Sequence, residues 1–170
     1  IGHAAYVLSH AYPHFPKGTI HLVGLEPRDQ SDCRTIIASI NGHYFVGADS
    51  GLFSLLGSEA DYFHVMQPYN SFAALENYVP VATELSKGKK PEQLGSPITD
   101  ALKLFARQPK VTKREIVGNI IRVDRFGNLI TNILQTDFEK IMELNGQKPF
   151  EIQVGLQVFT KIHQSYCGFV

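Results

Sequence analysis

The chain has 170 residues, 44% of them apolar, which is enough to bury the core of one ordinary domain or of two small ones. Sixteen basic residues balance sixteen acidic residues without forming a basic block, so the charge pattern does not favour a polyanionic partner. The apolar runs are far too short to span a bilayer, and residues 1–14 lack the layout of a signal peptide. We therefore expect neither a nucleic acid nor a membrane as a partner.

In chain order, helical and strand patterns alternate over the first part of the sequence. Prolines at positions 13 and 16 stop the first helix, and an Asn-Gly pair marks a hairpin turn. The expected elements are a helix over 3–12, a strand buried on both faces over 19–25, hairpin strands over 35–40 and 44–49, a short helix or strand over 50–57, and a helix over 75–88 with Pro80 in its first turn and Gly88 at its end.

A polar stretch over residues 87–100 then leads to residues 101–110, where we place a domain boundary near residue 110. Beyond it the expected elements are strands over 115–124 and 128–134, a short helix over 136–146, and strands over 150–155 and 158–166. The sequence thus predicts an α/β domain with a mixed or parallel sheet over 1–110, and a mainly antiparallel β domain over 111–170.

Cysteine and histidine are not spaced as metal ligands. Cys33 and Cys167 lie far apart, so we expect free thiols in a reducing, cytoplasmic compartment. His10 and His14 have i, i+4 spacing, but Pro13 breaks that helix and no third ligand lies nearby, so we expect no metal. Nucleophile-elbow, P-loop and G-x-G-x-x-G patterns are absent from the sequence as well.

Three polar residues, at two places in the chain, are candidates for a ligand site. Glu26 directly follows the strand over 19–25, where ligands bind if that strand is parallel; the alternative is a carboxylate that starts a polar turn with Pro27. Asp124 and Asn128 flank a hairpin bend, so both side chains can face one ligand; the alternative is hydrogen bonding to their own turn.

Four segments in one order resemble a known family: "AAYVLSHAYPHFPKGTIHLVGLEP", "GHYFVGADSGLFSLL", "YVPVATELSKG" and "VDRFGNLITNI". They are similar to the S-adenosyl-L-methionine (SAM) hydroxide adenosyltransferases, relatives of the fluorinase and chlorinase. The resemblance implies an α/β domain, a β-barrel-like C-terminal domain, and a homotrimer that binds SAM between the N-terminal domain of one subunit and the C-terminal domain of the next.

The resemblance also implies a reaction without metal or further cofactor. Hydroxide, or a halide in the halogenases, attacks the ribose C5′ of SAM, and the hydrolytic members release adenosine and L-methionine. By similarity, Asp124 accepts from the methionine ammonium and Asn128 bonds the adenine, while Gly127 gives the turn its backbone freedom.

The catalytic set of the hydrolytic members, an Asp, an Arg and a His, is altered in this chain. Their "VDPGVGTxRR" loop becomes "LEPRDQSDCR", with Glu26 at the Asp position, Cys33 at the Arg position and Arg34 at the next Arg. We expect Glu26 to act as base with Arg34 as its partner, although Glu26 extends the carboxylate by one methylene.

The second motif, "FHGRDxFAP" in the family, becomes "SFAALENYVP". Ser71 and Phe72 match and are expected to contact the substrate, whereas Ala73 replaces the His and cannot carry a proton. The chain also lacks the family's opening strand with its acidic loop and the end of the C-terminal domain, so we expect a piece of a longer protein. The sequence leaves open a SAM hydrolase, a catalytically silent SAM- or adenosine-binding sensor or assembly subunit, and a halogenase.

Overall fold

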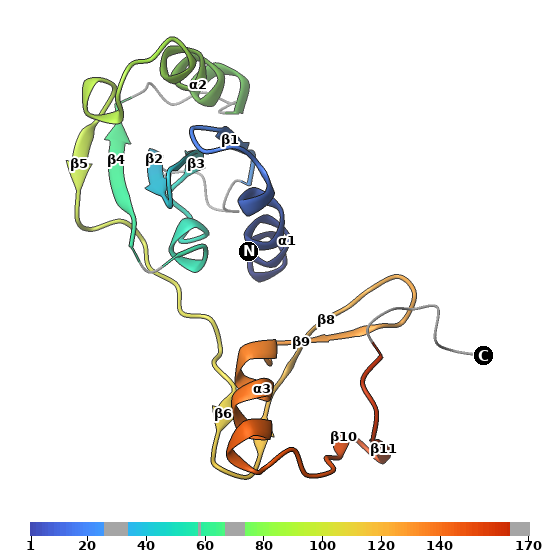
Figure 1. Cartoon of the computed structure of the whole chain (residues 1–170). Helices are drawn as coiled ribbons and strands as arrows, with labels where there is room; N and C mark the ends of the chain where they lie inside the picture. Colours follow the sequence, from blue (N-terminus) through green and yellow to red (C-terminus); the bar gives the residue numbers. More distant parts are fainter. Residues whose placement is uncertain (26–33, 58, 67–73, 164–170) are drawn as a thin grey trace. The chain divides into compact units, whose positions relative to one another are not determined.

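A computed structural model describes residues 1–25, 34–57, 59–66 and 74–163, except for the side chains at 74 and 75. The chain forms two compact units, Ile1–Ala106 and Arg107–Val170. Figure 1 shows the helices and strands of each unit. Within the described ranges, no helix has the length and apolar character that crossing a membrane requires.

The first unit is built on a five-stranded mixed sheet with the strand order β1-β3-β2-β4-β5. β1 runs parallel to β3, and the other neighbouring strands are antiparallel. The Asn-Gly turn joins β2 and β3 as predicted, with positive φ at both turn residues. The strands are β1 Ile20–Val23, β2 Thr35–Ile40, β3 His43–Ala48, β4 Asp61–Val65 and β5 Ser96–Ile98.

Helices cover both faces of this sheet. Alternate residues of β2 point to opposite faces: Ile36 belongs to the core that includes Ala5 of α1, and Ile37 to the core that includes Val81 of α2. The predicted first and last helices of this unit are confirmed, and Pro80 lies in the first turn of α2. The helical elements are α1 Gly2–Ala11, η1 Tyr12–His14, η2 Phe53–Leu55, η3 Ala74–Tyr78, α2 Val79–Ser86 and η4 Pro91–Gln93.

The prediction that residues 19–25 form a strand buried on both faces is wrong. β1 is an edge strand of the described sheet, and Leu22 remains about half exposed. The strand is nevertheless rich in apolar residues because single side chains of it pack against the two cores. Ile20 packs against the core that includes Val81 of α2, and Val23 packs against the core that includes Ala5 of α1. β4 and β5 were not predicted, because β4 carries polar residues and β5 contains a proline, which only an edge strand tolerates.

The second unit is mainly antiparallel β, as predicted, and holds one helix. Its strands pair as three separate two-stranded ribbons, so the described part of this unit contains no closed barrel. Its elements are β6 Lys110–Val111, β7 Ile116–Val117, β8 Ile120–Val123, β9 Leu129–Thr131, α3 Gln135–Leu144, β10 Ile152–Val154 and β11 Gln157–Phe159.

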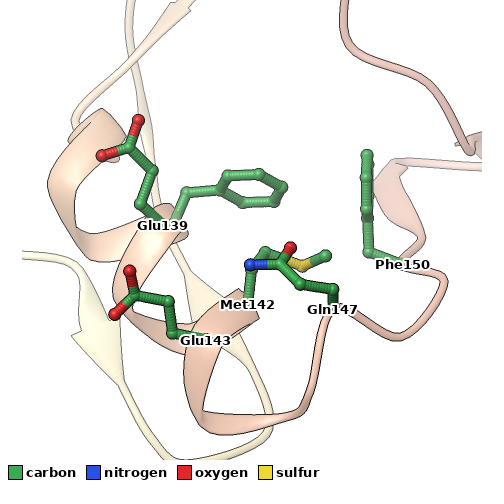
Figure 2. Close-up of a pocket in the computed structure, with 6 residues that line it drawn as sticks. Glu139, Met142, Glu143, Gln147 and Phe150 are labelled. Carbon is green, nitrogen blue, oxygen red and sulfur yellow. The ribbon is translucent and has the colours of Figure 1, made fainter.

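The helix α3 borders a groove of about 320 Å³ (Figure 2). The ring of Phe138 meets that of Phe150 edge-on, with 5.1 Å between the ring centroids. Residues from α3 and from the turn that follows it line the groove: Phe138, Glu139, Met142, Glu143, Gln147 and Phe150. Neither Asp124 nor Asn128, the two described residues that are expected to bind SAM, lines this groove.

A pair of histidines, the partly buried His21 on β1 and His43 on β3, packs against the ring of Tyr12. His43 is fully buried, and its Nδ1 lies 3.4 Å from Nε2 of His21, while its own Nε2 has no hydrogen-bond partner among the residues that the structure describes. The Tyr12 ring meets the His43 ring edge-on, with centroids 5.2 Å apart. Burial, reinforced by the Lys17 ammonium, lowers the pKa of His43. Burial and then the charge of His43 lower the pKa of His21, so folding disfavours the protonated form of both rings.

We expect the first unit to lose stability as the pH falls below about 6.5, because unfolding lets these histidines take up protons. Each neutral buried histidine lowers the free energy of unfolding by up to about 1.4 kcal/mol per pH unit, until the pH reaches its folded pKa. Urea unfolding at a series of pH values, followed by NMR at the β2 and β3 amides, measures this slope. His43→Gln is expected to flatten it and the exposed His14→Gln to leave it unchanged; an equal slope in both variants contradicts this account.

Candidate functional site

The structure describes some of the predicted site residues and not others. Arg34, Asp124 and Asn128 are described, Arg34 in the first unit and the other two in the second. The remaining predicted positions lie outside the described residues: Glu26, Cys33, Ser71, Phe72 and Ala73.

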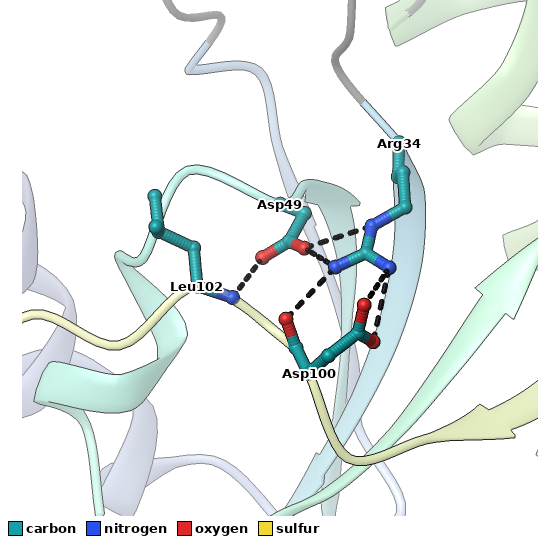
Figure 3. A network of polar contacts seen from close by, with 4 residues as sticks. All are labelled: Arg34, Asp49, Asp100 and Leu102. Carbon is teal, nitrogen blue, oxygen red and sulfur yellow. Dashed lines mark hydrogen bonds and ion pairs between the residues drawn. The ribbon is translucent and has the colours of Figure 1, made fainter.

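Arg34 stands directly before β2, and two carboxylates hold its guanidinium (Figure 3). Its Nε and Nη2 donate to Oδ2 of Asp49 at 3.1 and 2.6 Å, so this pair is bidentate on the arginine side. Its Nη1 donates to both carboxylate oxygens of Asp100 at 3.0 Å, and Nη2 also donates to the Asp100 backbone carbonyl at 3.1 Å. These bonds match the number of N–H groups that a guanidinium has.

The two carboxylates differ in their surroundings. The side chain of Asp49 is only 6% exposed, and its Oδ1 accepts a hydrogen bond from the Leu102 N–H at 2.9 Å. The side chain of Asp100 is 72% exposed. A solvent-screened pair contributes about 0–1 kcal/mol, whereas an unpaired buried carboxylate costs several kcal/mol. Asp49 is therefore the partner that fixes Arg34.

This network bears on the role predicted for Arg34. The hydrogen bond to Asp49 leads the interactions that raise the pKa of Arg34, so the guanidinium is a permanent cation. To hold Glu26 it would have to give up a bond to one of the two aspartates. The pairing of Arg34 with Glu26 stays a prediction. Sequence reasoning missed Asp49 and Asp100, although an acid directly after β3, at the end of "YFVGAD", was a signal for Asp49.

In the second unit, Asp124 and Asn128 are brought together by the turn between β8 and β9. Oδ1 of Asp124 accepts from the backbone N–H of Phe126 at 2.8 Å and of Asn128 at 2.9 Å. Oδ2 accepts from the side-chain amide of Asn128 at 2.8 Å. Gly127 has φ +85°, as its predicted role in the turn requires. The alternative left open by the sequence, hydrogen bonding within the turn, is therefore present.

These bonds do not exhaust what the turn offers to a ligand. Oδ2 of Asp124 accepts one hydrogen bond within the described residues, so it retains room for a second donor. The Asn128 side chain gives one N–H to Asp124, which leaves its second N–H and its carbonyl oxygen. The side-chain hydrogen bond from Asn128, followed by that from its backbone, lowers the pKa of Asp124, so its carboxylate is charged at neutral pH. The ligand roles of both residues stay predictions.

Comparison with known proteins links both units to one family. The family model described as the SAM hydroxide adenosyltransferase N-terminal domain matches residues 1–95. The model for the C-terminal domain of the same family matches residues 118–169. Together these matches cover most of the chain.

Two curated relatives are each named (R)-S-adenosyl-L-methionine hydrolase. The protein from Thermus thermophilus is 28% identical over 162 residues, which is 85% of this chain and 62% of the relative. The protein from Methanocaldococcus jannaschii is 29% identical over 143 residues, which is 78% of this chain and 49% of the relative. The chain thus spans about half to three fifths of the length of these relatives.

Solved structures share the fold. An uncharacterized conserved protein from Thermotoga maritima superposes with a TM-score of 0.77 at 26% identity, over 93% of this chain and 64% of that one. A conserved hypothetical protein from Thermus thermophilus superposes with a TM-score of 0.60 at 28% identity, over 78% of this chain and 54% of that one.

We expect Asp124→Ala to loosen the 124–128 turn, because both carboxylate oxygens accept hydrogen bonds from it. The amides of Phe126 and Asn128 should then exchange with solvent faster, which NMR hydrogen exchange at constant pH measures. Arg125→Ala is the control, since Arg125 lies over the Phe126 ring and gives no hydrogen bond to Asp124. Unchanged exchange in Asp124→Ala would mean that the carboxylate does not hold the turn.

A pH titration tests the same bonds. Because the folded pKa of Asp124 is depressed, its stabilisation of the turn is fully present above about pH 4, the ordinary value, and is lost as the pH falls through the folded pKa. Asn128→Ala removes the largest cause of the depression, so the midpoint measured by NMR at Asp124 is expected to move upward.

Proposed function

The chain belongs to the SAM hydroxide adenosyltransferase family, and from this we propose that the protein it represents hydrolyses SAM to adenosine and L-methionine. The observation that carries the proposal is the match of residues 1–95 and 118–169 to the two domains of that family. The name shared by the two curated relatives supports the same reaction.

The chemistry requires a water to attack C5′ in line with the C5′–S bond. The C5′–O bond forms, the C5′–S bond breaks, and its electron pair stays on sulfur, so that the sulfonium becomes the neutral thioether of methionine. The attacking water loses one proton. We propose Glu26 as its acceptor, since Ala73 cannot take a proton and Cys33 brings no permanent charge. Positioning of the water against C5′ supplies a large part of such a rate enhancement, about 7–11 kcal/mol in favourable models.

We propose that Asp124 and Asn128 bind SAM, together with Ser71 and Phe72. The geometry of the turn supports this for the first two residues. The Asp124 carboxylate is charged and retains acceptor capacity at Oδ2, which suits the methionine ammonium. The free edge of the Asn128 amide offers one donor and one acceptor, which suits a base edge. Hydrogen bonds inside the turn hold both side chains in place before a ligand arrives.

A second candidate function is SAM or adenosine binding without catalysis. One observation favours it: the guanidinium of Arg34, the residue that follows the altered Arg position in the sequence, is already bonded to Asp49 and Asp100. With alanine at the His position, water activation then depends on Glu26 alone. Both candidate functions share three further proposals: the second domain closes into a barrel-like form, the protein is a homotrimer with SAM at the subunit interface, and it is located in the cytoplasm.

We expect the protein, incubated with SAM, to release adenosine and L-methionine above the spontaneous rate, as measured by chromatography. In ¹⁸O-labelled water the label should enter the 5′-hydroxyl of adenosine, because the nucleophile attacks C5′. A parallel run with chloride tests for chloroadenosine and hence for a halogenase. A calorimetric titration of the same sample reports binding: tight binding without product supports the silent relative, and neither binding nor product overturns both functions.

We expect Glu26→Gln to lower kcat by at least about 100-fold if Glu26 is the base, with a smaller effect on SAM affinity. Glu92→Gln, which neutralises an exposed carboxylate on η4, is the matched control and should leave turnover unchanged. Equal turnover in wild type and Glu26→Gln removes Glu26 from the mechanism.

A further inference from the structure

Residues 100–104 run in an extended path between β5 and the second unit, and side chains of the first unit bond their backbone. The carbonyl of Asp100 accepts from Arg34 Nη2 at 3.1 Å, as Figure 3 shows. The N–H of Leu102 donates to Oδ1 of Asp49 at 2.9 Å, and the N–H of Leu104 donates to Oγ of Ser54 at 2.8 Å. Every second residue is thus bonded along one edge, as in a strand, but the partners are side chains.

The turn after β3 is also shaped to receive this segment. Gly51 has φ +79°, and a Cβ at that position would lie 2.5 Å from Cγ of Leu104. A side chain at this position would be strained by the positive φ, and its Cβ would force the Leu104 side chain to shift. Ala101 is buried as well. The segment is therefore held by apolar contact in addition to its hydrogen bonds.

The side chains that bond the backbone of residues 100–104 are themselves held in place by further contacts. Asp49 is nearly buried, and Arg34 neutralises it while Leu102 bonds its second oxygen. The hydroxyl of Ser54 donates to the Gly51 carbonyl at 2.8 Å, which aims its oxygen lone pairs at the Leu104 N–H. Arg34, Asp49 and Ser54 thus each have a second contact that fixes their position.

We propose that Arg34, Asp49, Gly51 and Ser54 form a cradle that fixes residues 100–104, and that these four are positioning residues for the reaction. The inference rests on the proposed function, in which each chain contributes its two units to SAM sites that it shares with neighbouring subunits. Residues 100–104 end at the connection to the second unit, so the cradle fixes where the chain leaves the first. A fixed exit reduces the conformations that must be ordered when SAM binds, which favours affinity. Arg34 acts here through the segment and not on the reacting atoms.

The test measures the cradle directly through two amides, those of Leu102 and Leu104. Ser54→Ala removes the bonds of the Ser54 hydroxyl to Leu104 and to the Gly51 carbonyl but no bond to Leu102. We nevertheless expect hydrogen exchange to speed about tenfold or more at both amides, because the segment opens as one unit. Asp100→Asn, which alters an exposed side chain, is a second variant that leaves the core intact and should speed exchange at Leu102. Ser86→Ala is the matched control: its hydroxyl bonds the Thr83 carbonyl on α2, away from the segment.

Acceleration confined to Leu104 in Ser54→Ala, with Leu102 unchanged, overturns the cradle. Its positioning role is read from SAM binding and kinetics: we expect Kd and KM for SAM to rise about three- to tenfold in Ser54→Ala with kcat little changed. Faster exchange at both amides without any change in SAM affinity overturns the positioning role. If the wild-type protein itself does not bind SAM, the proposed function and the positioning role fail together, while the exchange result still decides whether the cradle exists.

Discussion

The charge of Asp49 is the constraint on which the first unit depends. Burying a carboxylate that is only 6% exposed is costly without a cation and donors beside it, and Arg34 and the Leu102 N–H provide both. One group thereby ties together the start of β2, the end of β3 and the segment that follows β5. The exposed ion pair with Asp100 adds little energy by itself, but it lets the same guanidinium reach the backbone of that segment.

In the second unit, the turn at 124–128 satisfies its own polar groups in a comparable way. An Asp that accepts two backbone N–H bonds and one amide bond is well ordered before any ligand arrives. The hydrogen bonds within the turn are therefore compatible with its proposed binding of a ligand, since a preorganised acceptor loses less conformational freedom on binding. The same hydrogen bonds that satisfy the turn lower the pKa of Asp124, so its carboxylate stays charged to a lower pH than an ordinary aspartate.

Local features of the fold were predictable from the sequence, and non-local ones were not. The Asn-Gly hairpin and the helices depend on turn chemistry and periodicity within a few residues, and both predictions are confirmed. β5, with its proline, is recognisable only once its partner β4 is known. The partners of Arg34 lie 15 and 66 residues away in the chain, so no spacing rule predicts them. The proposed site was found through resemblance, because its residues follow no general motif of catalysis.

Binding and catalysis make different demands on this chain. Binding needs acceptors and donors fixed in place, and the 124–128 turn has them. Water activation needs a base that is free to take a proton and a cation that is free to stabilise charge. Arg34 meets neither demand, because its N–H groups are used by Asp49 and Asp100, and releasing Asp49 would leave a buried charge. In the proposed reaction, Glu26 is therefore expected to take the proton of the water while Arg34 stays bound to Asp49 and Asp100.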